Sequence, residues 1–252
     1  MLETLYEAGF GSPLRFGLRH PLRLARRWST LRRDPVDFAQ RFGVPAATVR
    51  GWLGELAPFR AAVARAFERT GLPLDRANFG SRNTTLYLFV RRFRPSHIVE
   101  TGVEYGFSTA HLLQGLHDNG SGDLVSIDLP TTDPRGHLSD GRWDGAYVRS
   151  TELTGAAIPE GLRSRWELLL GDSRDLLPAV LDRHPIDAFF HDSDHAAASM
   201  IREYRASWER LADGGLLLSD DINLNRAFDE FAAERARTPF RWADGRRGAI
   251  QK

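Results

Sequence analysis

Short apolar runs, each ending at a polar residue, recur from residue 95 onward and alternate with stretches of helical periodicity, the first over 108–116. Such runs are typical of strands that are buried on both faces of a parallel sheet. The pattern predicts an α/β fold with a doubly wound, mostly parallel sheet and helices on both of its faces. The predicted strands are 97–101, 124–128, 166–171, 186–192 and 215–220.

The last part of the chain indicates a hairpin that is added to this sheet. A helix over roughly 225–235 is followed by Phe240-Arg241-Trp242, a turn at Asp244-Gly245 and the apolar pair Ala249-Ile250. An Asp-Gly pair between two short apolar segments is a strong hairpin signal. We therefore expect a closing hairpin after the last helix.

The beginning of the chain lacks this alternation and favours helices. A basic amphipathic stretch covers 14–31, Asp37 can cap a second helix, and 57–70 has apolar spacing near 3.6. We therefore divide the chain into a helical extension, 1–94, which acts as a cap or in oligomerisation, and a sheet domain, 95–252.

One segment of the extension also has the spacing of a DNA-binding helix-turn-helix. Apolar residues and a glycine follow one another at Phe38, Gly43, Val49 and Trp52, and Arg50 is available for a phosphate. Two short helices joined at such a turn occur in many helical subdomains. Helix packing is the favoured interpretation, and a ligand-sensing DNA-binding regulator is an alternative.

Charge is distributed unevenly along the 252 residues, although the formal net charge is only +1. Residues 1–94 carry 17 arginines and 7 acids, whereas 95–252 carries 17 basic and 26 acidic residues. A basic extension can bind nucleic acid, but docking onto the acidic half of its own chain is the favoured interpretation, so nucleic acid is not an expected partner. A homo-oligomer formed through the N-terminal helices is a further expectation.

The absence of cysteine excludes disulfides, thiolate metal sites and a cysteine nucleophile. Chemistry must then use carboxylates, histidines, hydroxyls or a cofactor. No apolar run approaches the ~20 residues that a membrane span needs, and Glu3 and Glu7 lie where a signal peptide would be basic and then apolar. We expect a cytoplasmic protein without a membrane partner.

The turn after the first predicted strand has the composition of a ligand-binding loop. Its sequence over 100–109 is Glu-Thr-Gly-Val-Glu-Tyr-Gly-Phe-Ser-Thr. Gly102 and Gly106 let the backbone pass close to a ligand, and Ser108 with the amides of the helix N-terminus can hold a carboxylate.

The end of the second predicted strand adds Asp128, which is placed to accept hydrogen bonds from two ribose hydroxyls. A dinucleotide-binding fold would use the same acid, but it would place a glycine at the position of Glu104, where a carboxylate repels a pyrophosphate. A cofactor without phosphate therefore fits better than the nicotinamide dinucleotide of a dehydrogenase.

Acids also gather at the ends of the fourth and fifth predicted strands, which we expect to be neighbours. Asp192 ends the fourth strand, and Asp220 and Asp221 end the fifth. Three unpaired carboxylates raise one another's pKa and destabilise a fold, and a hard divalent cation such as Mg²⁺, Mn²⁺ or Ca²⁺ resolves this. The pattern predicts a metal site, with a helix cap at Asp192 and a plain turn at Asp220-Asp221 as alternatives.

His195 follows Asp192 by three residues and is the candidate general base, because an imidazole with a reference pKa of ~6.5 can take a proton at neutral pH. The long connection over 129–165 is a candidate lid. The residues of this connection that are candidates for contacts with the substrate that accepts a transferred group are His137, Trp143 and Tyr147.

Together these motifs resemble class I S-adenosylmethionine-dependent methyltransferases with a Rossmann-like sheet, and among them the metal-dependent O-methyltransferases. The resemblance covers roughly 95–252. Glu-x-Gly-x-x-x-Gly-x-Ser over 100–108 is shared with catechol and caffeoyl-coenzyme A O-methyltransferases. Asp192-Ser193-Asp194-His195 and Asp220-Asp221 are similar to bacterial sugar and macrolide O-methyltransferases, whereas Glu104 departs from the catechol-type pattern.

The resemblance implies O-methylation of a hydroxyl on a small molecule, such as a sugar, a polyketide or another natural-product intermediate, with S-adenosylmethionine and Mg²⁺ or Mn²⁺ as cofactors. His195 would be the base, and Asp192, Asp220 and Asp221 would bind the metal. An enzyme on the same scaffold with other chemistry, as in the cephalosporin hydroxylase group, is the alternative. The cofactor-binding residues that the resemblance implies are Glu100, Gly102, Gly106, Ser108, Asp128, Asp172, Ser173 and Asp192.

Overall fold

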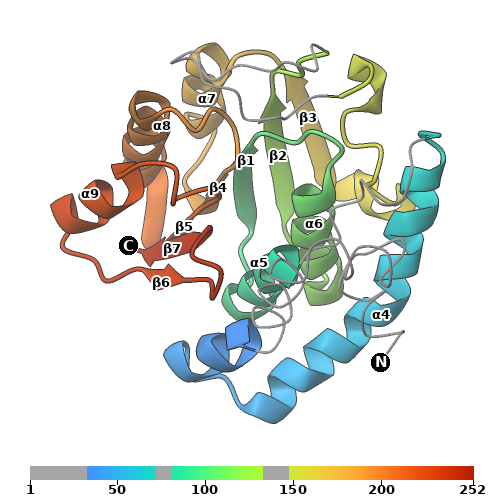
Figure 1. Ribbon diagram of the computed structural model, residues 1–252, viewed down its shortest axis with the longest axis horizontal. Helices are drawn as coiled ribbons and strands as arrows, with labels where there is room; N and C mark the ends of the chain where they lie inside the picture. The colour runs from blue at the N-terminus through green and yellow to red at the C-terminus, as the bar shows by residue number, and fades with distance from the viewer. Residues whose placement is uncertain (1–32, 72–80, 133–147) are drawn as a thin grey trace, which may run out of the picture.

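The computed structural model describes residues 33–71, 81–132 and 148–252 (Figure 1). The basic amphipathic helix expected over 14–31 lies outside the described residues. The same holds for the candidate acceptor contacts His137, Trp143 and Tyr147.

A seven-stranded sheet forms the centre of the protein, with strand order β3-β2-β1-β4-β5-β7-β6. The first five strands in this order run parallel, and β7 and β6 complete the sheet in antiparallel orientation. The predicted mostly parallel sheet and the predicted closing hairpin are therefore both confirmed. The strands are β1 (His97–Thr101), β2 (Asp123–Asp128), β3 (Trp166–Leu170), β4 (Ile186–His191), β5 (Leu211–Ser219), β6 (Phe240–Arg241) and β7 (Gly248–Gln251).

Helices cover both faces of this sheet, as expected for a doubly wound fold (Figure 1). Successive strand residues point to opposite faces. Phe190 of β4 therefore packs with the helices of one face and Phe189 with those of the other. On the first face lie a helix over 33–41, α4 (Ala46–Glu68), α5 (Ser81–Phe93) and α6 (Phe107–Asn119), and on the second lie α7 (Ser173–Leu181), α8 (Ala197–Arg210) and α9 (Ala227–Glu234).

The fifth strand begins earlier than predicted, at Leu211 immediately after α8. Its pairing with β4 shifts register between Ile186 and Ala188, so the additional residues form an irregularity in the ladder. Asp213 and Gly214, which has a positive φ, lie in this irregular part, just before the apolar run from which the strand was predicted.

The described part of the extension packs on the sheet domain through apolar side chains. Phe38 is fully buried against Phe42 and Phe89, and Val49 belongs to the same core cluster. Helix packing therefore explains the spacing that is typical of a helix-turn-helix, and the predicted helix over 57–70 is the second half of α4. No described helix is long and apolar enough to cross a membrane.

Candidate active site

The carboxyl ends of three strands meet at one edge of the sheet because β1 lies between β2 and β4. Thr101, the last residue of β1, pairs with Ile127 of β2 and with His191 of β4. Asp128 and Asp192 follow these two partners directly, and their carboxylates lie on either side of the turn that leaves β1. The topology thus assembles the acids that the sequence placed at strand ends.

Two adjoining cavities open at this edge. One, of about 200 Å³, is lined by Asp220 and Arg247 among others, and the second, of about 750 Å³, extends over Asp172 and Ser173. Pockets for small organic ligands usually measure ~300–1,000 Å³. The larger cavity therefore has room for a nucleoside-sized group, and the smaller cavity has room for the reacting end of such a ligand. The residues that line both are Gly102, Asp128, Leu129, Pro130, Thr131 and Ser193.

Asp128 is buried at the junction of the two cavities. Its Oδ1 accepts a hydrogen bond from the Val103 amide at 2.8 Å, whereas its buried Oδ2 has no hydrogen-bond partner among the described residues. Burial raises the pKa of Asp128, and the amides of Val103 and Glu104 oppose this shift. A buried acceptor without a partner is costly, so Asp128 is prepared for a ligand that donates hydrogen bonds.

The two glycines of the first turn are required by contacts within the chain. A Cβ at Gly102, where φ is +86°, would lie 2.0 Å from the carbonyl oxygen of Asp192. A Cβ at Gly106, where φ is +84°, would lie 2.9 Å from the Cα of Gly155. Of the two, only Gly102 lines a cavity, so the structure assigns Gly106 to packing against the following loop.

Glu100 differs from its predicted role as a cofactor contact because it is fully buried and lines neither cavity. Its carboxylate accepts hydrogen bonds from three hydroxyls, those of Ser108 at 3.1 Å, Thr109 at 2.8 Å and Ser126 at 2.7 Å. Burial raises the pKa of Glu100 to about 7, although these hydroxyls lower it. Ser108 lines the smaller cavity, but its hydroxyl donates to Glu100.

A second buried glutamate, Glu203 of α8, was missed by the sequence reasoning. Its carboxylate accepts hydrogen bonds from Thr101 Oγ1 at 2.6 Å, His191 Nδ1 at 2.7 Å, Ser193 Oγ at 3.1 Å and the Ser173 hydroxyl. Although burial opposes it, the interaction with His191 holds the pKa of Glu203 below its ordinary value. Glu203 therefore ties the ends of β1 and β4 to the N-terminus of α7.

The two predicted cofactor residues at that N-terminus take part in internal contacts and also line the larger cavity. Asp172 caps α7, accepting a hydrogen bond from the Arg174 amide at 2.8 Å, and it also pairs with the Arg174 side chain. These bonds lower the pKa of Asp172, mainly through the Arg174 side chain. Asp192 does not form the helix cap expected as its alternative, since α8 has no side-chain cap, and it is Asp194 that accepts a hydrogen bond from the Ala196 amide just before this helix.

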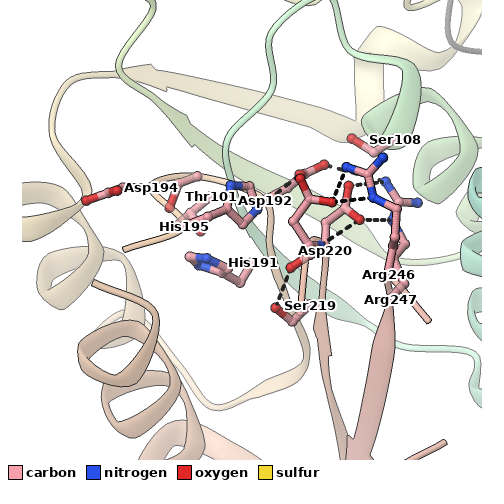
Figure 2. A network of polar contacts seen from close by, with 12 residues as sticks. Thr101, Ser108, His191, Asp192, Asp194, His195, Ser219, Asp220, Arg246 and Arg247 are labelled. Carbon is pink, nitrogen blue, oxygen red and sulfur yellow. Dashed lines mark hydrogen bonds and ion pairs between the residues drawn. The ribbon is translucent and has the colours of Figure 1, made fainter. Parts of the chain in front are cut away.

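The carboxylates at the ends of β4 and β5 are compensated by arginines from the closing hairpin. Arg247 reaches Asp220 with Nε at 3.1 Å from Oδ1 and Nη2 at 3.1 Å from Oδ2, and its Nη2 lies 3.6 Å from Asp192 Oδ2. Arg246 Nε donates to Asp221 Oδ1 at 2.7 Å. Figure 2 shows both arginines on one side of the carboxylates and His191 and His195 on the other.

The pKa values in this cluster follow from the same contacts. Burial and the neighbouring Asp220 carboxylate raise the pKa of Asp192, whereas Arg247 lowers it. Although burial opposes the charged form, the carboxylates of Asp220 and Asp192 hold the pKa of Arg247 above its ordinary value. The Arg247 guanidinium is therefore a permanent positive charge in the wall of the smaller cavity.

These contacts do not fit the metal site that the sequence predicts at Asp192, Asp220 and Asp221. Within 33–71, 81–132 and 148–252, no group of three or more histidine or acidic side chains is arranged to hold a metal ion. The physical reason is that guanidinium groups already face the carboxylate oxygens on which a cation would be held. Sequence reasoning missed both arginines, which lie just beyond the predicted Asp244-Gly245 turn.

His195 is buried in the wall of the smaller cavity, as expected for a base that acts there. Its Nε2 lies 3.8 Å from Asp192 Oδ1, and its ring meets that of His191 edge to face at 5.4 Å between centroids. Asn225 Nδ2 donates to the His195 carbonyl at 2.9 Å and so fixes the backbone at this position.

Comparison with known protein families gives this site a context. Residues 99–222 match the family model described as a methyltransferase domain. The chain carries a methyltransferase domain. The expectation of a class I methyltransferase is thereby confirmed for the domain and its fold. No curated protein is a significant match to the chain.

Solved structures support the fold of the methyltransferase domain. An O-methyltransferase from Bacillus cereus in complex with SAH is 18% identical, with a TM-score of 0.54 over 76% of this chain and 91% of that chain. An O-methyltransferase from Streptomyces achromogenes involved in tomaymycin synthesis, in complex with SAM, is 20% identical, with a TM-score of 0.52 over 76% of this chain and 86% of that chain. A methyltransferase from Podospora anserina, bound to SAH, is 16% identical, with a TM-score of 0.52 over 75% of this chain and 86% of that chain.

The methyltransferase domain supplies only part of the site. Asp128, Asp192 and His195 lie inside the matched residues, as do Asp220 and Asp221. From outside the match, the hairpin arginines Arg246 and Arg247 contact Asp221 and Asp220, and Asn83 of α5 accepts a hydrogen bond from Arg247.

Proposed function

We propose that this protein transfers the methyl group of S-adenosylmethionine to a hydroxyl oxygen of a small molecule. The observation that carries the proposal is the buried, unpartnered Oδ2 of Asp128 at the end of β2 in the methyltransferase domain. An acceptor atom at that position fits the ribose hydroxyls of the cofactor. The larger cavity beside it, which extends over Gly171 and Asp172, fits the adenine end.

S-adenosylmethionine supplies an electrophilic methyl group on sulfur. The residues of this chain orient the two reactants and accept the proton that the hydroxyl group loses. Gly102 lines both cavities and is the candidate for a close approach of the methionine end, with Ser108 in the wall beyond it. Asp192 and His195 line the wall of the smaller cavity, where they would face the reacting end of a bound cofactor.

We assign the general base to His195. Its imidazole accepts the proton of the acceptor hydroxyl as the oxygen takes the methyl group, and Asp192, 3.8 Å away, stabilises the imidazolium that forms. The Asn225 bond to the His195 backbone supports this by limiting the movement of the base. Orientation of the two reactants in one small cavity supplies the remainder of the rate enhancement.

The acceptor we propose is a polyhydroxylated molecule, with a sugar unit of a natural product as the leading class. Most of the described residues that line the smaller cavity carry polar or charged side chains, and Phe107 is the one benzene ring among them. The carboxylates of Asp192 and Asp220 can accept hydrogen bonds from further hydroxyls. Mg²⁺ or Mn²⁺ has no part in this proposal, because the residues around Arg247 do not fit a metal site.

Calorimetry with S-adenosylmethionine, followed by a radiolabelled methyl-transfer assay on glycosides, polyketides and catechols, tests the proposal. We expect the wild type to bind the cofactor and to methylate an acceptor from the glycoside group. His195→Gln should retain cofactor binding and lose at least about a hundredfold in kcat. The matched control is His117→Gln, an exposed residue at the end of α6.

Three outcomes count against parts of this proposal. Absence of cofactor binding would overturn it and return attention to a ligand-sensing regulator. Cofactor binding without transfer to any acceptor would favour the same-scaffold enzyme with other chemistry. Equal activity of His195→Gln and the wild type would remove His195 as the base.

A further inference from the structure

We propose that Arg247 is the resident cation of this site, with its guanidinium in the place where a divalent metal would contact Asp192 and Asp220. The protein then carries out its reaction without a bound metal ion. The meaning of this inference for catalysis rests on the proposed methyl transfer, whereas the position of the cation rests on the contacts of Arg247 alone.

The first step of the argument is geometric. The guanidinium donates a hydrogen bond from Nη2 to Asp220 Oδ2, forms an ion pair with Asp220 Oδ1 through Nε and extends to Asp192, so a single group bridges the carboxylates at the ends of β4 and β5. A divalent cation at the same point would need the same oxygens as ligands. The two arrangements exclude each other, because the Arg247 side chain is only 2% exposed and already occupies the space beside these oxygens (Figure 2).

The second step concerns how firmly Arg247 is held. Its Nη1 donates to Asn83 Oδ1 at 2.6 Å, and its guanidinium carbon lies 5.2 Å from the centroid of the Phe190 ring. The first contact comes from α5 and the second from β4. Withdrawal of Arg247 would leave Asn83 and Asp220 without these bonds inside the protein, so the side chain is a fixed part of the site.

The third step is the charge balance. Asp192, Asp220 and Asp221 would carry three negative charges, and Arg246 and Arg247 supply two positive ones. The strong field that draws a divalent ion to a carboxylate cluster is therefore largely cancelled. The hairpin arginines therefore supply the positive charge that the predicted metal ion would have supplied to the three carboxylates.

The fourth step links the cation to the acceptor. A guanidinium has five N–H groups. The contacts to Asn83, Asp220 and Asp192 use at most four of them, and Arg247 lines the smaller cavity. The remaining N–H can donate to the acceptor oxygen as negative charge develops on it, which is the electrostatic role that a metal would otherwise fill.

Manganese titration followed by electron paramagnetic resonance tests the position of the cation directly, on the full chain and in the absence of any acceptor. We expect no saturable Mn²⁺ binding by the wild type up to about 1 mM. Arg247→Gln should bind Mn²⁺ at least about tenfold more tightly, and Asp192→Asn added to it should abolish that binding. Arg246→Gln, which also removes one positive charge from the cluster but retains Arg247 between Asp192 and Asp220, is the matched control and should gain far less Mn²⁺ affinity than Arg247→Gln.

Two further measurements keep the test decisive. If Arg247→Gln does not fold, the wild type and Arg247→Lys, which keeps the positive charge, should both fail to bind Mn²⁺. Saturable Mn²⁺ binding by the wild type that is lost in Asp192→Asn would overturn the inference. Where a methylated acceptor is found, the rate should be unchanged by a chelator, and a rate that requires Mg²⁺ would also overturn it.

The failure of this inference can be told apart from the failure of the proposed function. A wild type that binds no Mn²⁺ and methylates no acceptor would refute only the methyl-transfer proposal. A wild type that methylates an acceptor and binds Mn²⁺ through Asp192 would refute only the role of Arg247.

Discussion

Two regions of the same sheet edge hold buried or half-buried carboxylates in different ways. At the ends of β1 and β2, Glu100 and Asp128 receive hydrogen bonds from hydroxyls and from a backbone amide. At the ends of β4 and β5, Asp192 and Asp220 face the guanidinium of Arg247. The first region uses neutral donors, and the second uses a charged one.

This difference separates two tasks. Neutral donors compensate a buried carboxylate only in part, so the pKa values of Glu100 and Asp128 are raised and Oδ2 of Asp128 is left for a ligand. In the second region burial and Asp220 also raise the pKa of Asp192, but the Arg247 guanidinium opposes this shift with a full positive charge. We propose that the first region receives the cofactor and that the second holds charge next to the acceptor.

The largest effect should come from removal of the charged donor in the second region. Arg247→Gln leaves Asp220 and Asp192 in the interior without their guanidinium, and we expect it to lower the free energy of unfolding by about 3–5 kcal/mol in urea denaturation. Adding Asp220→Asn should recover part of the loss. Arg183→Gln, which breaks an exposed pair with Glu167, is the control and should cost less than about 1 kcal/mol. A loss for Arg247→Gln no larger than that of the control would remove the difference between the regions.

The second prediction concerns the first region and pH. The pKa of Glu100 is raised to about 7, so folding favours the neutral carboxyl. Relative to Glu100→Gln, the wild type should be most stable below pH ~4.5 and should lose about 3 kcal/mol as the pH rises through the folded-state pKa. Urea denaturation between pH 5 and pH 8 measures this.

The control for this prediction is Glu68→Gln, an exposed glutamate on α4. Its free energy of unfolding should follow that of the wild type at every pH. A constant difference between Glu100→Gln and the wild type would show that the hydroxyl donors fully compensate the Glu100 charge, which would make the two regions alike.

The strands and the acids at their ends could be predicted from the sequence, but the side chains that contact those acids could not. Apolar runs report burial in a parallel sheet directly, and strand order then brings Asp128 and Asp192 to one edge. The three hydroxyls around Glu100 come from β2 and α6, so its complete burial depends on how those elements pack. The early start of β5 at Leu211 likewise depends on pairing with β4 rather than on residue pattern.

The arginine partners were unpredictable for a related reason. Arg247 lies 27 positions after Asp220, on a hairpin whose antiparallel register decides which side chain enters the cluster. A shift of one residue would exchange Arg246 and Arg247 between the interior and the surface. Glu203 left a weak signal, because it shares a helix face with Met200 and Tyr204, where an acid is unusual.

The third prediction tests whether the first region receives a ligand. Asp128→Asn removes the charged acceptor that we assign to the ribose hydroxyls, and it should weaken S-adenosylmethionine binding by about 30-fold, close to 2 kcal/mol, in calorimetry. Asp123→Asn, at the opposite end of β2 and exposed, is the matched control and should bind as the wild type. Equal affinities of the two variants would place the cofactor elsewhere.

The smallest effect should come from Arg246, which marks the limit of the second region. Its side chain is 44% exposed and pairs with Asp221 at the rim of the cluster, where solvent and salt screen the interaction. Arg246→Gln should therefore lower the free energy of unfolding by less than about 1 kcal/mol, and raising the salt concentration should reduce this difference. A loss as large as that of Arg247→Gln would mean that Asp221 is compensated as an interior charge, and the charged region would then extend to the rim of the sheet.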